Sequence, residues 1–174
     1  KSAAVQLGFI GLAQFLPLFL QTPVSGWAAD HYDRRRIAQA TALLQLLCAG
    51  MLGVATWEGW VSLPFIFAIA MLLGVARAFS GPALAALAPN LVPPAALPRA
   101  IAISSTVWQV GVIIGPAVGG YAYAIRHWGA YALASLLFGI GIVTLASIGK
   151  VPQPARETNR HPVRQMIDGI SYVR

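Results

Sequence analysis

Charge is what this 174-residue sequence has least of. Charged residues make up 10% of it and hydrophobic residues 57%, whereas soluble domains carry about 25% charged residues. A soluble domain of this size needs charged side chains to cover its surface, so the composition indicates a membrane protein. The sequence also has only one cysteine, Cys48. A single thiol excludes an intrachain disulfide and a zinc site built from several cysteines.

The charges that are present are mostly positive, with twelve Lys and Arg against five Asp and Glu. A basic balance often indicates a nucleic-acid partner, but here the positive residues fall in short gaps between apolar runs, which is typical of membrane topology. We therefore expect a lipid bilayer as partner and no nucleic acid. Because no cluster of His or carboxylate residues is visible at one depth within the spans, we also expect no enzyme activity, no metal and no cofactor.

Five long runs have no charged residue, apart from one arginine in the third run. Each run reaches the roughly 20 residues that a helix needs to cross a bilayer. None shows the period-two alternation of a membrane β-strand. The sequence therefore predicts an all-α membrane protein with transmembrane helices at about 4–27, 37–57, 62–88, 99–123 and 129–148.

The gaps between these runs predict the orientation. If the spans alternate, nine Lys and Arg lie on one side of the membrane and two on the other. Positive residues favour the cytoplasmic side, so the side with nine Lys and Arg is expected to face the cytoplasm. Residue 1 is then expected on the outer side of the cell (inner) membrane. The polar segment 150–174 is expected to be a cytoplasmic loop with a short amphipathic helix. Trp57, Trp60 and Trp128 lie near the outer gaps and are candidate interface anchors.

The gap after the first run, "GWAADHYDRRR", concentrates several ionisable residues. A topological stop signal would explain its arginines, since these are attracted to anionic headgroups. It does not explain Asp30, which the same headgroups repel. Asp30 and Arg34 are four residues apart, so they would meet on one face of a helix that continued past Asp30. Asp30 therefore needs a partner, either Arg34 or the N-terminus of another helix.

Arg77 is the charged residue inside a predicted span. Inserting an arginine at the centre of a membrane helix costs about 2.5–3.5 kcal/mol on insertion scales. We expect its side chain to face the protein interior or a water-filled cavity. The alternative is a structural partner for a carbonyl or an acid on another helix.

The stretch "VGVIIGPAVGGYAYA" places Gly111, Gly115 and Gly119 on one helix face, where another helix backbone can approach closely. Pro116 removes one backbone hydrogen bond and loosens the helix there. Gln109 lies near this stripe and is a candidate for a substrate path; the alternative is an interhelical hydrogen bond.

In this order and spacing, the three stretches resemble conserved motifs of the major facilitator superfamily. His31 and Asp33 depart from the usual Arg and Gly of the first motif. The matching residues are Gly26, Asp30, Arg34 and Arg35 for motif A, Arg77 and Gly81 for motif B, and Gly111, Gly115, Pro116, Gly119 and Gly120 for motif C.

The resemblance implies a transporter of twelve helices in two halves that rock about a central site. The chain would then hold helices two to six and the central loop, as part of an N-terminal six-helix bundle, with the first helix and the C-terminal half missing. Asp30, Arg34 and Arg35 would form a cytoplasmic latch, meaning a set of contacts that holds the outward-facing state. Arg77 would be linked to proton coupling.

Motif C is typical of exporters in that superfamily, and the "D-x-x-D-R-R" variant resembles the branch of enterobactin-type exporters. The expected function is therefore efflux of a drug-like or siderophore-like small molecule, driven by a proton gradient. A solute importer of the same fold and a membrane scaffold that does not transport remain the alternatives.

Overall fold

The computed structural model describes residues 5, 8–13, 15, 32–87 and 90–148. The described chain is helical and contains no strand within these ranges, so the predicted all-α class is confirmed. Most of the predicted span 4–27 and all of segment 150–174 lie outside the described residues. The elements are α2 Arg34–Glu58, α3 Leu63–Leu87, the 3₁₀ turn η2 Pro94–Ala96, α4 Leu97–Ile125 and α5 Gly129–Ser147.

Four of the described segments are long and apolar enough to cross a membrane. Their bounds lie within three residues of the predicted spans, the largest difference being α2, which begins at 34 and not at 37. The charge-free windows located these helices because a charged residue inside the hydrocarbon layer is costly. The windows missed the first turn of α2, which consists of arginines.

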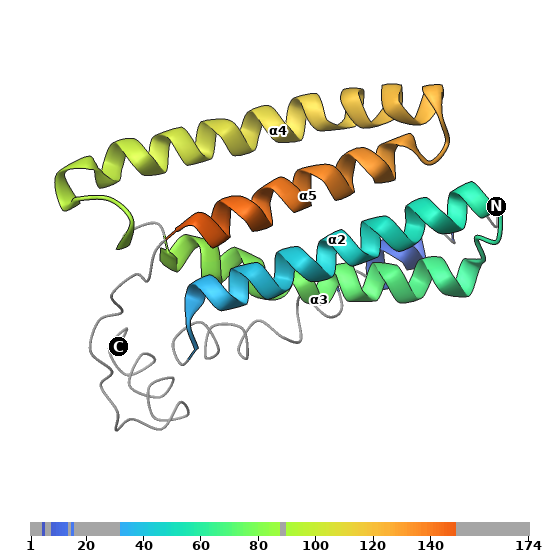
Figure 1. Ribbon diagram of the computed structural model, residues 1–174, viewed down its shortest axis with the longest axis horizontal. Helices are drawn as coiled ribbons and strands as arrows, with labels where there is room; N and C mark the ends of the chain where they lie inside the picture. The colour runs from blue at the N-terminus through green and yellow to red at the C-terminus, as the bar shows by residue number, and fades with distance from the viewer. Residues whose placement is uncertain (1–4, 6–7, 14, 16–31, 88–89, 149–174) are drawn as a thin grey trace.

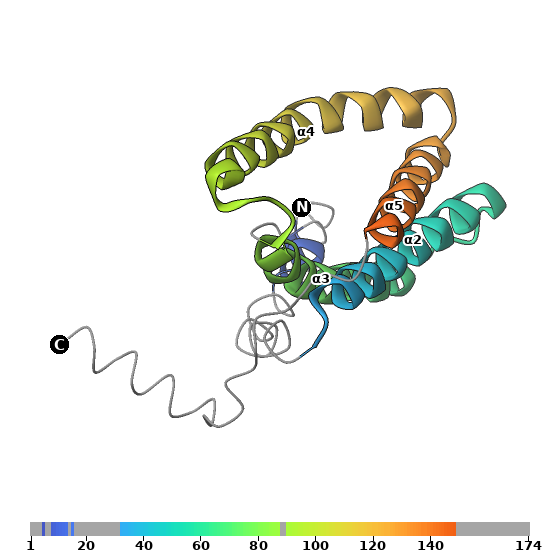
Figure 2. The same cartoon turned by 60° about the vertical axis from the view of Figure 1, so that its left-hand side comes forward.

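The helices follow a curve in the order α3, α2, α5, α4, seen close to end-on in Figure 2. α2 packs along both α3 and α5, and α4 packs against α5 (Figure 1). The buried residues of α2 and α3 are mostly small, and Ala55, Ala76 and Ala83 have no exposed surface. Small residues allow helix backbones to approach closely. α4 and α5 contain no buried residue, so the core lies along α2 and α3.

The antiparallel helices give the molecule two ends. The Arg34 end holds the starts of α2 and α4 and the last turns of α3 and α5. The Trp57 end holds the α2–α3 turn and the start of α5. Here Gly59 ends α2 in the left-handed region, at φ 78°, and its N–H donates to the Ala55 carbonyl. Such a conformation favours glycine because it has no Cβ.

Close contact between α2 and α5 depends on a glycine. A Cβ added to Gly53 would lie 3.4 Å from the Cβ of Tyr131 on α5, which is an ordinary van der Waals distance. A larger side chain has no such room unless the two helices separate. The position therefore sets how closely α2 and α5 pack.

We predict that Gly53→Ala is tolerated and that Gly53→Ile destabilises the protein by about 1–3 kcal/mol, as is usual for overpacked contacts. The measurement is thermal unfolding of the purified protein in detergent. Equal unfolding midpoints for the two variants would show that α2 and α5 do not meet at this residue.

Candidate functional site

Asp33 determines where α2 begins. Its backbone is extended, at φ −60° and ψ 110°, and its Oδ1 accepts a hydrogen bond of 3.0 Å from the N–H of Arg35. This is an N-cap, which satisfies one of the free N–H groups at a helix start. Oδ2 also lies 3.9 Å from Nε of the exposed Arg36. Sequence reasoning noted Asp33 as a departure from motif A and as part of the "D-x-x-D-R-R" variant, but not as a helix cap. An Asp directly before a helical run was the signal for this cap.

The helix pairing considered for Asp30 and Arg34 required a helix that continues past Asp30. Tyr32 is in a bend and Asp33 is extended, so α2 does not continue in that direction. The spacing of four residues therefore does not place the two side chains on one helix face. Gly26 and Asp30 themselves lie outside the described residues.

Arg34 connects the start of α2 to the end of α3. Its Nη1 donates a hydrogen bond of 2.9 Å to the carbonyl oxygen of Ala86, in the last turn of α3. The side-chain amide of Asn90 donates to the same oxygen at 3.2 Å. The last carbonyls of a helix have no partner within the helix, so these two contacts satisfy a group that lipid would leave unpaired.

Arg35 makes the equivalent connection to α5. Its Nε donates to the Leu145 carbonyl at 3.0 Å and its Nη2 to the Ala146 carbonyl at 2.7 Å. The planar guanidinium fork suits two neighbouring acceptors. A cation at a helix C-terminus also stabilises the helix dipole. Consecutive arginines on α2 therefore hold the ends of two different helices, and Figure 1 shows these ends close to the start of α2.

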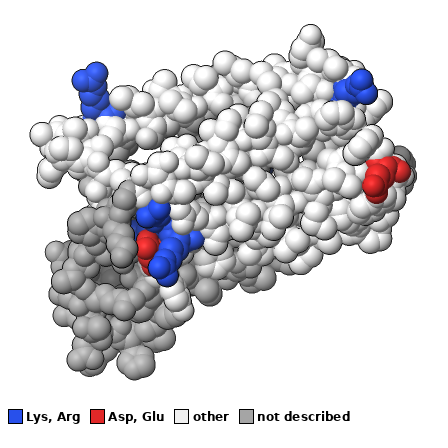
Figure 3. Space-filling view, viewed as in Figure 1, with Lys and Arg blue, Asp and Glu red and all other residues white. Residues whose placement is uncertain are grey.

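Charged side chains lie near the two ends on the face shown in Figure 3, with an uncharged band between them. The band corresponds to the middle of the apolar helices. Among the described residues, no group of three or more His, Cys, Asp and Glu could hold a metal ion.

Arg77 lies within this apolar length, ten residues before the end of α3, which is about 15 Å along the axis. Its neighbours Ala76 and Ala78 are buried, while Arg77 is exposed. The guanidinium therefore does not lie in the α2–α3 contact. Gly81 follows one turn later with open space around its Cα.

The glycine stripe of α4 is also open. A Cβ added to any of the four glycines of α4 would meet no described atom within 4 Å. The helix continues through Pro116 to Ile125. The predicted packing seam therefore has room for another helix backbone, and no described side chain fills it. The four glycines are Gly111, Gly115, Gly119 and Gly120.

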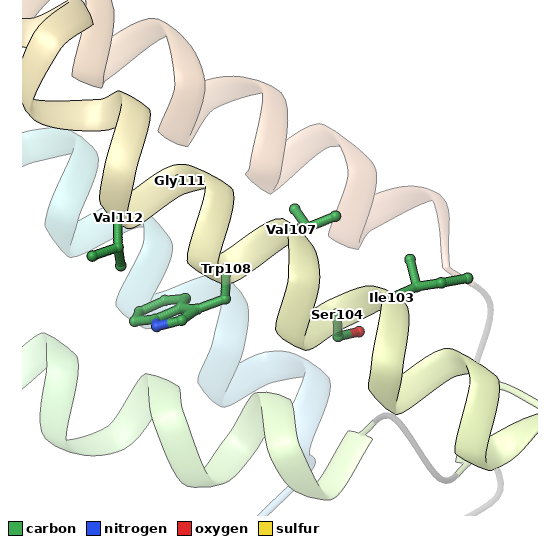
Figure 4. A pocket seen from close by; sticks show the side chains of 6 residues that line it. All are labelled: Ile103, Ser104, Val107, Trp108, Gly111 and Val112. Atoms are coloured by element: carbon green, nitrogen blue, oxygen red, sulfur yellow. The ribbon is translucent and has the colours of Figure 1, made fainter.

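A hollow of about 600 Å³ lies over the same face of α4 (Figure 4). At 100° per residue, Ser104 and Gly111 lie at the middle of this face. Trp108 and Val112 flank it on one side, and Ile103 and Val107 on the other. Figure 4 shows Trp108 extending from α4 on the side of α2 and α3.

Trp108, not Gln109, lines this hollow. Gln109 is exposed on α4 but is not among the lining residues, so the hollow gives no support to Gln109 as a substrate-path residue. Trp108 is 74% exposed. Its signal in the sequence was a large aromatic residue three positions before the first glycine of the stripe.

Comparison with known families matches residues 2–171 to the Major Facilitator Superfamily. The chain belongs to the major facilitator superfamily. The match covers nearly the whole sequence, as the resemblance carried by the three motifs predicted. In the superfamily's terms, the described part of motif A is the start of α2, motif B lies on α3 and motif C on α4. The described chain is thus part of a multi-pass membrane protein.

Curated relatives are similar over almost the entire chain. An uncharacterized MFS-type transporter, y4rN, of Sinorhizobium fredii is 27% identical over 99% of this chain. Macrolide efflux protein A of Streptococcus pyogenes is 22% identical over 99% of it. The Staphyloferrin A transporter of Staphylococcus aureus is 27% identical over 95%. The chain spans only 42–43% of the length of these relatives.

We predict that Arg35→Ala lowers the stability of the protein by about 1.5–3 kcal/mol, the usual value for hydrogen bonds to a charged group. Arg35→Lys recovers only part of this loss because an ammonium cannot reproduce the fork. Thermal unfolding in detergent measures both effects. Arg36→Ala is the matched control, since that side chain is 85% exposed. An equal change in Arg35→Ala and Arg36→Ala would contradict the role of Arg35.

Proposed function

We propose that the protein containing this chain is a proton-coupled secondary transporter that exports a drug-like or siderophore-like small molecule by alternating access. The observation that carries the proposal is the open face of α4, where the motif C glycines adjoin an apolar hollow with one aromatic side chain. Apolar pockets with few polar groups suit hydrophobic ligands. A glycine face without neighbours suits a helix contact that forms and separates during rocking.

The names of two relatives support the proposed substrate class, and one of them also supports export. One is named for macrolide efflux and another for a siderophore, staphyloferrin A. Motif C favours export over the alternative of a solute importer. A scaffold that does not transport would have no use for an arginine held at mid-depth in an apolar helix, which is costly in lipid.

The Arg34 end is the proposed cytoplasmic end, because the arginines concentrate there and at Arg99. In this orientation, the proposed latch adjoins the contacts of Arg34 and Arg35 with α3 and α5. Asp30 would complete the latch toward the second half of the transporter. A change at Asp30 would then alter the positions of the ends of α3 and α5 through the start of α2.

We expect an efflux-deficient host that expresses the full-length protein to tolerate higher concentrations of a macrolide or to export a siderophore faster. A protonophore should abolish the gain. Gly115→Val should also abolish it, because the added side chain fills the motif C face. Gly141→Val on α5 is the control, since Gly141 likewise has open space around it but lies outside the motif.

Transport by the Gly115→Val protein at the wild-type rate would contradict the role of α4. Loss of efflux in both glycine variants would mean that the motif C face of α4 matters no more for transport than the Gly141 position on α5. Substrate accumulation in the cells, driven by the same gradient, would favour the importer.

For the latch, we predict that Asp30→Asn reduces efflux at least about tenfold while the protein still reaches the membrane, which corresponds to the loss of about 1.4 kcal/mol. Asp33→Asn should have little effect, because Asn caps a helix start as well as Asp does. Unchanged efflux by Asp30→Asn would contradict the proposed latch. An equal loss of efflux in Asp30→Asn and Asp33→Asn would show that only the local charge matters.

A further inference from the structure

A second apolar recess lies on the opposite end of the molecule from the arginine contacts. It has a volume of about 400 Å³ and runs between α2 and α5 at the Trp57 end. We call it the Trp57 groove. Its lining residues are Gly50, Gly53, Val54 and Trp57 from α2 and Trp128, Ala132 and Ser135 from α5.

The groove exists because the α2 residues at its floor, Gly50 and Gly53, are glycines and have no side chain. A Cβ at Gly50 or Gly53 would lie 3.9 Å from the Ser135 hydroxyl oxygen or 3.4 Å from the Tyr131 Cβ. The two helices therefore meet at the floor, while larger side chains rise on either side. Trp57 is 75% exposed and Trp128 37% exposed, and both stand at the mouth.

Apart from the indole N–H groups of Trp57 and Trp128, the lining offers almost only hydrocarbon. The one hydroxyl in it, that of Ser135, already donates to the Tyr131 carbonyl at 2.9 Å. A polar or charged ligand would lose its hydration in this groove without receiving hydrogen bonds in return. The occupant is therefore an apolar chain.

Length and position fit one leaflet of a bilayer. From Gly50 to Trp57 the groove covers seven residues of α2, which is about 10 Å along the axis. One leaflet of the hydrocarbon core is about 15 Å deep. Tryptophans concentrate where hydrocarbon meets headgroups, so Trp57 and Trp128 place the mouth at that level, and Gly50 lies nearer the bilayer centre.

Charged residues of both signs are close in sequence to the two tryptophans of the groove. Glu58 follows Trp57 directly, and its Oε2 accepts a hydrogen bond of 2.6 Å from the Trp60 indole. Arg126 precedes Trp128 by two residues, at the end of α4. Figure 3 shows acidic and basic side chains together at this end. A phosphate beside the arginine and a primary ammonium beside the carboxylate would complement them.

We propose that the Trp57 groove binds one acyl chain of a phospholipid with an ethanolamine headgroup. Its phosphate lies toward Arg126 and its ammonium toward Glu58. The ethanolamine ammonium can donate hydrogen bonds to a carboxylate, and a choline group cannot. This site is independent of transport: the lipid is a structural ligand between α2 and α5 and need not move through the protein.

The experiment uses the full-length protein in liposomes that contain a trace of a phospholipid with a photoreactive acyl chain. Three probes are compared, with ethanolamine, choline or glycerol headgroups. After illumination, mass spectrometry of the peptides locates the labels. The ethanolamine probe should label segments 50–57 and 128–135 at least about threefold more than the other two probes, a preference of about 0.65 kcal/mol.

Two matched variants test the groove itself. Ala132→Phe fills it from an exposed position, so labelling there should fall at least about threefold. Val143→Phe adds a similar side chain on nearly the same face of α5, eleven residues away and outside the groove. Its labelling at the groove should stay at the wild-type level.

Variants at the mouth test the headgroup without altering helix packing. Glu58→Gln should reduce the preference for the ethanolamine probe, whereas Arg126→Gln should reduce labelling by all three probes by about fivefold, because each probe carries the phosphate. Uniform labelling along the lipid-facing helices would overturn the proposal, as would equal labelling by the three probes. Absence of label in the groove would also overturn it, because another helix or a second copy of the chain would then cover the site.

Discussion

The guanidinium groups of Arg34 and Arg35 extend from the first turn of α2 to the last turns of α3 and α5. A helix that ends near a bilayer leaves carbonyl groups without partners, and such groups are costly in apolar surroundings. Two neighbouring residues satisfy three of these carbonyls on two helices. Because α2 also packs along both of those helices, its start fixes how their ends are placed relative to one another.

These contacts connect three of the described helices at one end and leave one face of the fourth, α4, open. α2, α3 and α5 are connected at the Arg34 end, whereas α4 packs mainly against α5 and has an open glycine face. The glycines of motif C and the hollow beside Trp108 lie on that open helix. A transporter that rocks needs a rigid unit and a surface against which another unit can move. The described helices offer a connected group and an open helix face, and these features support the proposal of transport by alternating access.

The predictable and unpredictable features differ in their physical origin. The spans followed from local composition, because a charge within the hydrocarbon layer is costly whatever surrounds it. The family followed from three motifs whose order and spacing are visible in the sequence. The acceptors of Arg34 and Arg35 were not predictable, because residues 86 and 145 come close to α2 only through helix packing. The spacing of Asp30 and Arg34 in the sequence did not reveal that Asp33 begins α2 with an extended residue, and their pairing stays a prediction.

Asp33 itself illustrates a local signal that a family pattern obscured. The sequence comparison noted it as a departure from motif A, and as an N-cap it has a clear physical role. In the same way, the amide of Gln109 drew attention on α4, while the large apolar surface of Trp108 lines the hollow. Polar residues in apolar spans are conspicuous in a sequence, and exposed aromatic residues are not. Only the packing of neighbouring helices shows which aromatic side chains remain open.

The central claim is that the two arginines of α2 tie together the ends of α3 and α5. The most direct measurement is the distance between spin labels at Leu84 and Val143, which are exposed near those ends, in cysteine-free full-length protein. The account predicts one narrow distance distribution in the resting protein. It predicts a broader distribution when Arg34 and Arg35 are both replaced by alanine. The same narrow distribution in both proteins would contradict it.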